Sequence, residues 1–114
     1  MADLTGFKRD NDGAYIEKHP LANIQYGIDF TDYLNSGDSI SSTVITVESI
    51  SGDSAPLQFP TDAATDVSIA GAVVQFRLEG GTLNNIYNVD VRINTSEGDT
   101  DVRRFRIVIK EKVL

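Results

Sequence analysis

Residues 87–110, YNVDVRINTSEGDTDVRRFRIVIK, contain the strongest secondary-structure signal in the sequence. Apolar and polar residues alternate from residue 87 to residue 94, and a similar alternation runs from residue 104 to residue 110. A period of two is typical of a strand with one buried face. The polar connection between the two segments, residues 96–99, is short and contains a glycine. We therefore predict that they form an antiparallel hairpin.

Further strands are expected in the part of the sequence that precedes this hairpin. Residues 24–30 alternate in the same way and are followed by one helical turn, and residues 39–48 are rich in β-branched side chains. Residues 66–70 and 72–78 are two more short strand candidates. No segment has the pattern of a helix of about ten residues or more. The spacing predicts an all-β fold, a single immunoglobulin-like antiparallel β-sandwich of about seven strands.

Two features refine this fold prediction. Tyr87 stands at the entry of the penultimate strand, where sandwiches of this type place a tyrosine whose hydroxyl bonds to nearby backbone, with an ordinary core tyrosine as the alternative. The residues on the apolar faces of the strands define a predicted core: Tyr26, Ile28, Phe30, Phe76, Tyr87, Val89, Val91, Ile93, Phe105 and Ile107.

Length and composition exclude several classes of function. A chain of 114 residues is the size of one domain, and the absence of cysteine excludes disulfides, thiol nucleophiles and cysteine-ligated metals. No apolar run is long enough for a membrane helix. Ten basic against 17 acidic residues argue against direct binding of nucleic acid. Residues 19–76 have seven acidic residues and no Lys or Arg, whereas residues 77–114 contain a local cluster of arginines. The opposite potentials of these two regions could orient neighbouring copies; a merely solvated acidic surface is the alternative.

Residues 1–21 differ from the rest of the chain. They contain a polar, turn-rich stretch and few apolar residues, and they show no sustained periodicity. We expect an irregular N-terminal arm over 1–21 and the β-sandwich domain over 22–112. The arm is expected to dock on a neighbouring subunit, with Phe7 and Tyr15 as anchors, because aromatic residues are favoured at the centres of interfaces. An arm folded back along its own sandwich is the alternative.

No pattern in the sequence predicts catalysis, a metal site or a cofactor. The one histidine, His19, has no partner that the sequence can identify, and the stretch 10–13 lacks the ligands of a calcium loop at the required positions. We therefore predict a protein that is not an enzyme. Arg104 and Arg106 share the solvent face of the last strand. They are expected to pair across the hairpin with Asp90 or to contact the acidic region of a neighbour.

A resemblance to a known family rests on three motifs. Residues 18–20 read Lys-x-Pro, residues 26–34 read Tyr-x-x-Asp-aromatic-x-Asp-aromatic-Leu, and residues 37–42 read Gly-Asp-x-Ile-x-Ser. With Gly80-Gly81-Thr82, Tyr87 and the closing hairpin, this pattern resembles small immunoglobulin-like structural proteins of tailed bacteriophages, over most of residues 18–112. Phe30 and Tyr33 stand where that family usually has tryptophan.

The resemblance implies a virion protein that decorates the capsid or forms part of the neck or tail in many copies. Its partners would then be capsid, neck or tail subunits and copies of itself. An adhesin-type or carbohydrate-binding β-sandwich is the alternative. The motifs are structural, and they leave the location in the virion open.

Overall fold

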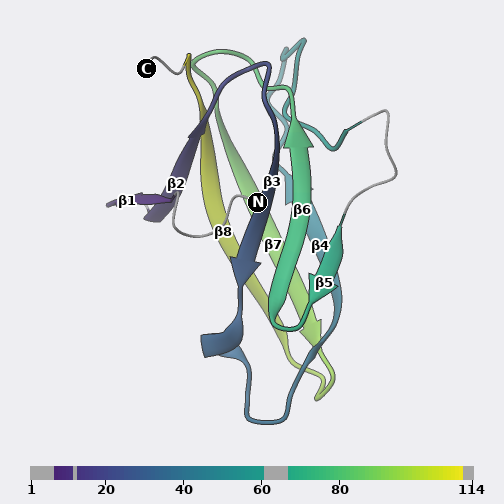
Figure 1. The fold of residues 1–114 in the computed structure, drawn as a ribbon. Coiled ribbons are helices and arrows are strands. Elements are labelled where there is room, and N and C mark those ends of the chain that lie inside the picture. The colour runs from purple at the N-terminus through teal and green to yellow at the C-terminus, as the bar shows by residue number, and fades with distance from the viewer. Residues whose placement is uncertain (1–6, 12, 61–66, 112–114) are drawn as a thin grey trace.

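The structure is a computed structural model, and it describes residues 7–11, 13–60 and 67–111. These residues form eight strands and one short 3₁₀ helix, and the predicted all-β sandwich is confirmed (Figure 1). Their bounds are β1 (Lys8–Asp10), β2 (Gly13–Lys18), β3 (Asn23–Asp29), η2 (Thr31–Tyr33), β4 (Ile40–Val47), β5 (Ser68–Ala70), β6 (Val73–Glu79), β7 (Ile86–Thr95) and β8 (Thr100–Ile109). The expected single helical turn after residue 30 is η2.

The strands form two sheets. A five-stranded sheet has the order β1-β2-β8-β7-β4, and a three-stranded sheet has the order β3-β6-β5. Figure 1 shows the smaller sheet in front of the larger one. Every pairing is antiparallel except that of β2 with β8, which is parallel. The predicted hairpin is β7–β8, closed by a turn in which Gly98 has a φ of 93°, a conformation that favours glycine.

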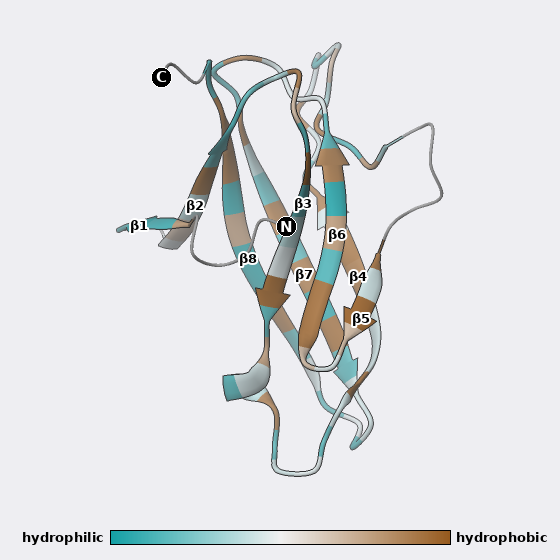
Figure 2. Ribbon diagram, viewed as in Figure 1, coloured by the Kyte–Doolittle hydropathy of each residue, from teal (hydrophilic) through white to brown (hydrophobic). Residues whose placement is uncertain are grey.

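The core lies between the two sheets. All ten residues of the predicted core are buried. Figure 2 shows brown and teal bands alternating along β6 and β7, as expected where one face of a strand packs inward and the other meets solvent. Burying one large apolar side chain contributes about 1.5–3 kcal/mol, so these inward faces supply the main driving force for folding. Burial also raises the pKa of the Tyr26 phenol.

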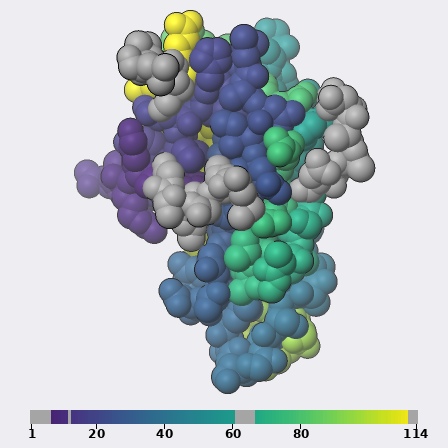
Figure 3. All heavy atoms as spheres, viewed as in Figure 1, coloured from purple at the N-terminus to yellow at the C-terminus, as the bar shows by residue number. Residues whose placement is uncertain are grey.

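The predicted irregular arm is wrong for residues 8–10 and 13–18, which form β1 and β2. Ile16 lies opposite Ile107 of β8 in the parallel ladder, and it packs against the core together with Phe7 and Ala14. Figure 3 shows β1 and β2, in purple, on the left flank of the molecule. Each residue of β2 in this parallel ladder pairs with a residue of β8 that lies 91 positions later in the sequence, so no local pattern could predict the pairing. Leu4, part of the expected arm, lies outside the described residues.

Lys18 ends β2 in a buried position that is rare for lysine. Its exposed fraction is 1%, and its Nζ donates hydrogen bonds to Gly80 O at 2.6 Å and to His19 O at 2.9 Å. Burial lowers the pKa of Lys18 to about 8, although the nearby Glu79 carboxylate acts in the opposite direction. The Lys-x-Pro motif thus holds the end of β2 against the turn that follows β6.

Polar contacts fix the loops at the two ends of the sandwich. The Tyr87 hydroxyl accepts a hydrogen bond from Thr82 N at 3.1 Å, as the sequence predicted, and also donates to the Asp53 carboxylate. The Thr82 hydroxyl also donates a hydrogen bond to the Asp53 carboxylate. The hydrogen bonds from the Thr82 and Tyr87 hydroxyls, that of Thr82 first, lower the pKa of Asp53. At the opposite end Asp38 accepts from Ser96 Oγ at 2.6 Å, which ties the loop before β4 to the β7–β8 turn.

Candidate interaction surface

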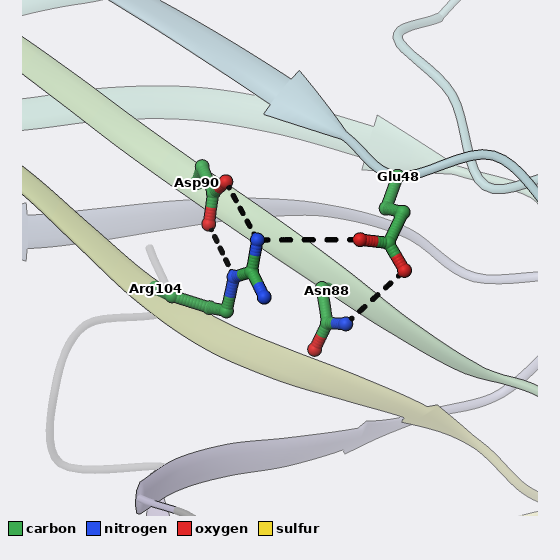
Figure 4. Close-up of polar contacts among 4 residues, drawn as sticks. All are labelled: Glu48, Asn88, Asp90 and Arg104. Carbon is green, nitrogen blue, oxygen red and sulfur yellow. Dashed lines mark hydrogen bonds and ion pairs between the residues drawn. The ribbon is translucent and has the colours of Figure 1, made fainter.

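The outer face of the larger sheet carries the predicted ion pair. Asp90 lies opposite Arg104 in the β7–β8 ladder, and Arg104 Nε and Nη2 donate to the two Asp90 oxygens at 2.6 and 3.0 Å. Glu48 lies 4.0 Å from the same guanidinium and accepts a hydrogen bond from Asn88 (Figure 4). The hydrogen bonds and charge of Arg104 lower the pKa of Asp90. An exposed pair of this kind adds little stability, but it holds Arg104 in one orientation.

Arg106 has different partners from those expected. It lies opposite Asn88 on β7, and its guanidinium contacts the Asp10 carboxylate and donates to Gly13 O at 3.1 Å. The Tyr15 ring lies 5.3 Å from the same guanidinium, at a distance suited to a cation–π contact. Arg106 and Tyr15 therefore join β1 and β2 to β8.

Phe7 packs against its own sandwich. Its ring lies edge-on to Phe105, with 5.1 Å between ring centroids. The described part of the N-terminal segment thus lies along its own domain, as the alternative to docking required. Phe7 and Tyr15 are nevertheless only partly buried, so each still presents some surface to solvent.

Beside Phe7 the structure contains a hollow of about 530 Å³. β2 pairs with β8 from Arg106 to Ile109, so among the described residues the first half of β8 has no strand on its outer edge. The hollow lies beside this unpaired half, and its walls come from both sheets. They include the apolar side chains Phe7, Ile28, Val91, Val102 and Phe105, with Arg9, Arg103, Arg104, Tyr33 and Asp29 supplying polar groups.

An arginine and a tyrosine stand together among the residues that line this hollow. The Arg103 guanidinium lies 4.0 Å from the centroid of the Tyr33 ring, and Arg103 Nε donates to Asp101 at 3.1 Å. Tyr33 is 52% exposed, and about half of the Arg103 side chain is accessible. The sequence did not indicate this pair, because η2 and β8 meet only through the tertiary fold. The only indication in the sequence was that Tyr33 is an aromatic position of the phage-protein motif at residues 26–34.

The described residues offer little for catalysis or metal binding. His19 Nδ1 accepts a hydrogen bond from Leu21 N at 3.1 Å, which is a local turn contact. Within the part of the chain that the structure describes, no group of three or more His, Asp or Glu side chains is placed to hold a metal ion. In that same part, no helix has the length and apolar character needed to span a membrane.

Comparison with known proteins identifies a family for the chain. No curated protein matches the sequence significantly. Residues 18–108, which run from the last residue of β2 to the residue before the end of β8, match the family model described as "Podophage GP4 fiber-tail adaptor protein gp77". The match agrees with the expected tailed-phage context and virion localisation. The chain therefore belongs to the Gp77 family and is a structural protein of a tailed-phage virion.

Proposed function

We propose that this protein is a non-enzymatic adaptor that joins a fibre to the tail of the phage. The observation that carries the proposal is the family match, because it extends over nearly all of the described sandwich. Among the locations that the sequence left open, the family description favours the tail over capsid decoration. It also favours a virion structural protein over a carbohydrate-binding module.

The strand order supports an immunoglobulin-like module within this proposal. In immunoglobulin constant-type domains one sheet has the order A-B-E-D and the other the order C-F-G. With β3 taken as strand B, the sheets β3-β6-β5 and β4-β7-β8 reproduce the orders B-E-D and C-F-G. The hydroxyl contact of Tyr87, at the start of the strand equivalent to F, is a second point of agreement. β2 lies beside β8, the strand equivalent to G.

The hollow is the surface that we assign to the other virion protein. Arginine and tyrosine are enriched among the residues that dominate binding energy at protein interfaces. Tyr33 and Arg103 are accessible, already stacked on each other, and next to apolar side chains of the core. An apolar side chain of the fibre or tail subunit would fill the hollow, with Phe7 and Arg104 at the border of the contact.

Particle assembly tests this proposal. We expect the double variant Tyr33→Ala and Arg103→Ala to stay folded with a melting temperature near that of the wild type, because about half of each side chain is exposed, but to yield particles with few fibres. The matched control is Ile86→Ala with Arg92→Ala, two exposed positions on β7 that do not line the hollow. Fibres counted by negative-stain microscopy should remain at the wild-type number in the control. Normal fibre occupancy in a folded Tyr33/Arg103 variant would exclude the hollow as the binding surface.

A further inference from the structure

The larger sheet has β4 as one of its two outer strands. β4 pairs with β7 on one side, and among the described residues no strand pairs with its other side. Open edges present unpaired N–H and C=O groups, and proteins usually protect them with charges, prolines or irregular pairing. From Ile40 to Val47 this strand has no charge and no proline, and its one irregularity lies between Ile40 and Ser42. The remaining six residues form a regular, unprotected edge.

The direction of the free backbone groups follows from the pairing with β7. Glu48 N donates to Asn88 O at 2.9 Å, which makes these two residues a hydrogen-bonded pair. Such pairs alternate along an antiparallel ladder, so Thr46 and Val44 also direct their backbone groups toward β7. Thr43, Ile45 and Val47 then direct their N–H and C=O groups toward the open edge.

We propose that a second copy of this chain pairs with β4 through the same edge, in antiparallel orientation and centred on Ile45. This centre places Thr43 opposite Val47, Val44 opposite Thr46, and Ile45 opposite itself. Every opposed pair therefore consists of β-branched residues, which pack well across strands. The three residues with free backbone groups meet each other, which allows about six hydrogen bonds between the copies.

Self-complementarity favours a second copy as the occupant, because residues 43–47 place β-branched residues opposite one another about Ile45. Each chain has a net charge of −7, so the repulsion between two copies is smallest where they meet at an uncharged surface. β4 is such a surface, and the proposed centre places Glu48 of one copy opposite Ser42 of the other, away from the other Glu48. The exposed Val44, with 54% of its surface accessible, also gains a partner. This inference adds self-association to the proposed adaptor function and rests on that function. Its test uses the isolated protein, so failure here and failure of fibre binding remain distinguishable.

Charged substitutions at opposed positions of the two β4 strands test the proposed register. Sedimentation equilibrium should show a dimer for the wild type at concentrations up to about 1 mM, a range that detects a Kd of that order. The double variant Val44→Lys with Thr46→Lys should have a Kd at least about tenfold higher, because it places like charges directly opposite each other. Val44→Glu with Thr46→Glu should behave likewise. An equal mixture of the two variants should regain dimers, since each lysine then faces a glutamate.

Controls and a covalent test complete the experiment. Ile86→Lys with Val102→Lys adds the same charge at exposed positions of β7 and β8, and should dimerise like the wild type. The chain has no cysteine, so Val44→Cys with Thr46→Cys should give a disulfide-linked dimer, because opposed residues of a non-hydrogen-bonded pair lie about 4.5 Å apart at Cα. A wild type that stays monomeric and a cysteine variant that does not cross-link would overturn the proposal. Unchanged dimerisation of the lysine variant would overturn the register.

Discussion

At the scale of single residues, hydrogen-bonded polar groups explain how the ends of the strands are held. Lys18, Tyr87 and Asp38 each bond to a segment far away in the sequence, and each closes a different turn of the sandwich. Lysine is seldom buried unless its ammonium group is satisfied, and here two carbonyl oxygens satisfy it. The cost of this burial appears as the lowered pKa of Lys18, which makes stability depend on pH.

Replacing Lys18 by Met should remove this pH dependence. Between pH 8 and 10.5 the unfolded chain keeps a proton on Lys18 that the folded chain has lost, so the wild type gains stability as the pH rises. From pH 7 to pH 9.5 the free energy of unfolding of the wild type should rise relative to Lys18→Met by about 2 kcal/mol. Urea unfolding of wild type and variant at both pH values measures this difference in free energy. Subtracting the variant from the wild type cancels the contribution of the other titrating groups.

The exposed Lys110 provides the control for this prediction. More than half of its side chain is accessible, so Lys110→Met should follow the wild type across the same pH range. If wild type and Lys18→Met instead run parallel from pH 7 to pH 9.5, Lys18 titrates in the folded protein as it does in the unfolded one. Its burial would then have no cost.

At the scale of elements, β2 completes the larger sheet. It covers the edge of β8 from Arg106 to Ile109, and β1 pairs with it in turn. Ile16 faces the core while Tyr15 stacks on Arg106 at the outer face, which is the alternation of an ordinary strand. The strands β1 and β2 are therefore part of the folded domain.

Deleting residues 1–17 should destabilise the domain. The truncation removes most of the pairing with β8 and the partly buried side chains of Phe7 and Ile16. Full burial contributes about 1.5–3 kcal/mol for each side chain, so partial burial of these two and the lost pairing together contribute about 2–3 kcal/mol. For a domain of this size we expect a fall in melting temperature of about 10 °C or more, measured by circular dichroism. Ile16→Ala should reproduce part of the loss, and Tyr15→Ala, on the outer face, much less. An unchanged melting temperature in the truncated protein would mean that β2 contributes nothing to the fold.

The sequence was sufficient to predict the elements that have a local signal. Alternation along β3, β6, β7 and β8 identified the buried faces, and the glycine-containing turn identified the hairpin. β2 was missed because it is short and gains its stability from a parallel neighbour that is distant in the sequence. For the same reason the ion pair of Arg104 with Asp90 was predictable from the hairpin register, whereas the Arg106–Asp10 contact and the Tyr33–Arg103 stack were not.

At the scale of the whole molecule, the sandwich has two separate candidate contact surfaces. The hollow lies beside β8 and the open edge lies along β4, and these strands are separated by β7 within one sheet. A contact on one surface therefore leaves the other accessible. This separation is what an adaptor needs if it is to bind another virion protein while it pairs with a copy of itself.

Cryo-electron microscopy of the intact virion would test whether this sandwich connects fibre and tail. We expect density that fits the two-sheet domain at the junction between tail and fibre, with a subunit of another protein seated in the hollow next to Tyr33 and Arg103. Density for this domain on the capsid surface, with none at the fibre junction, would exclude the adaptor role and favour capsid decoration.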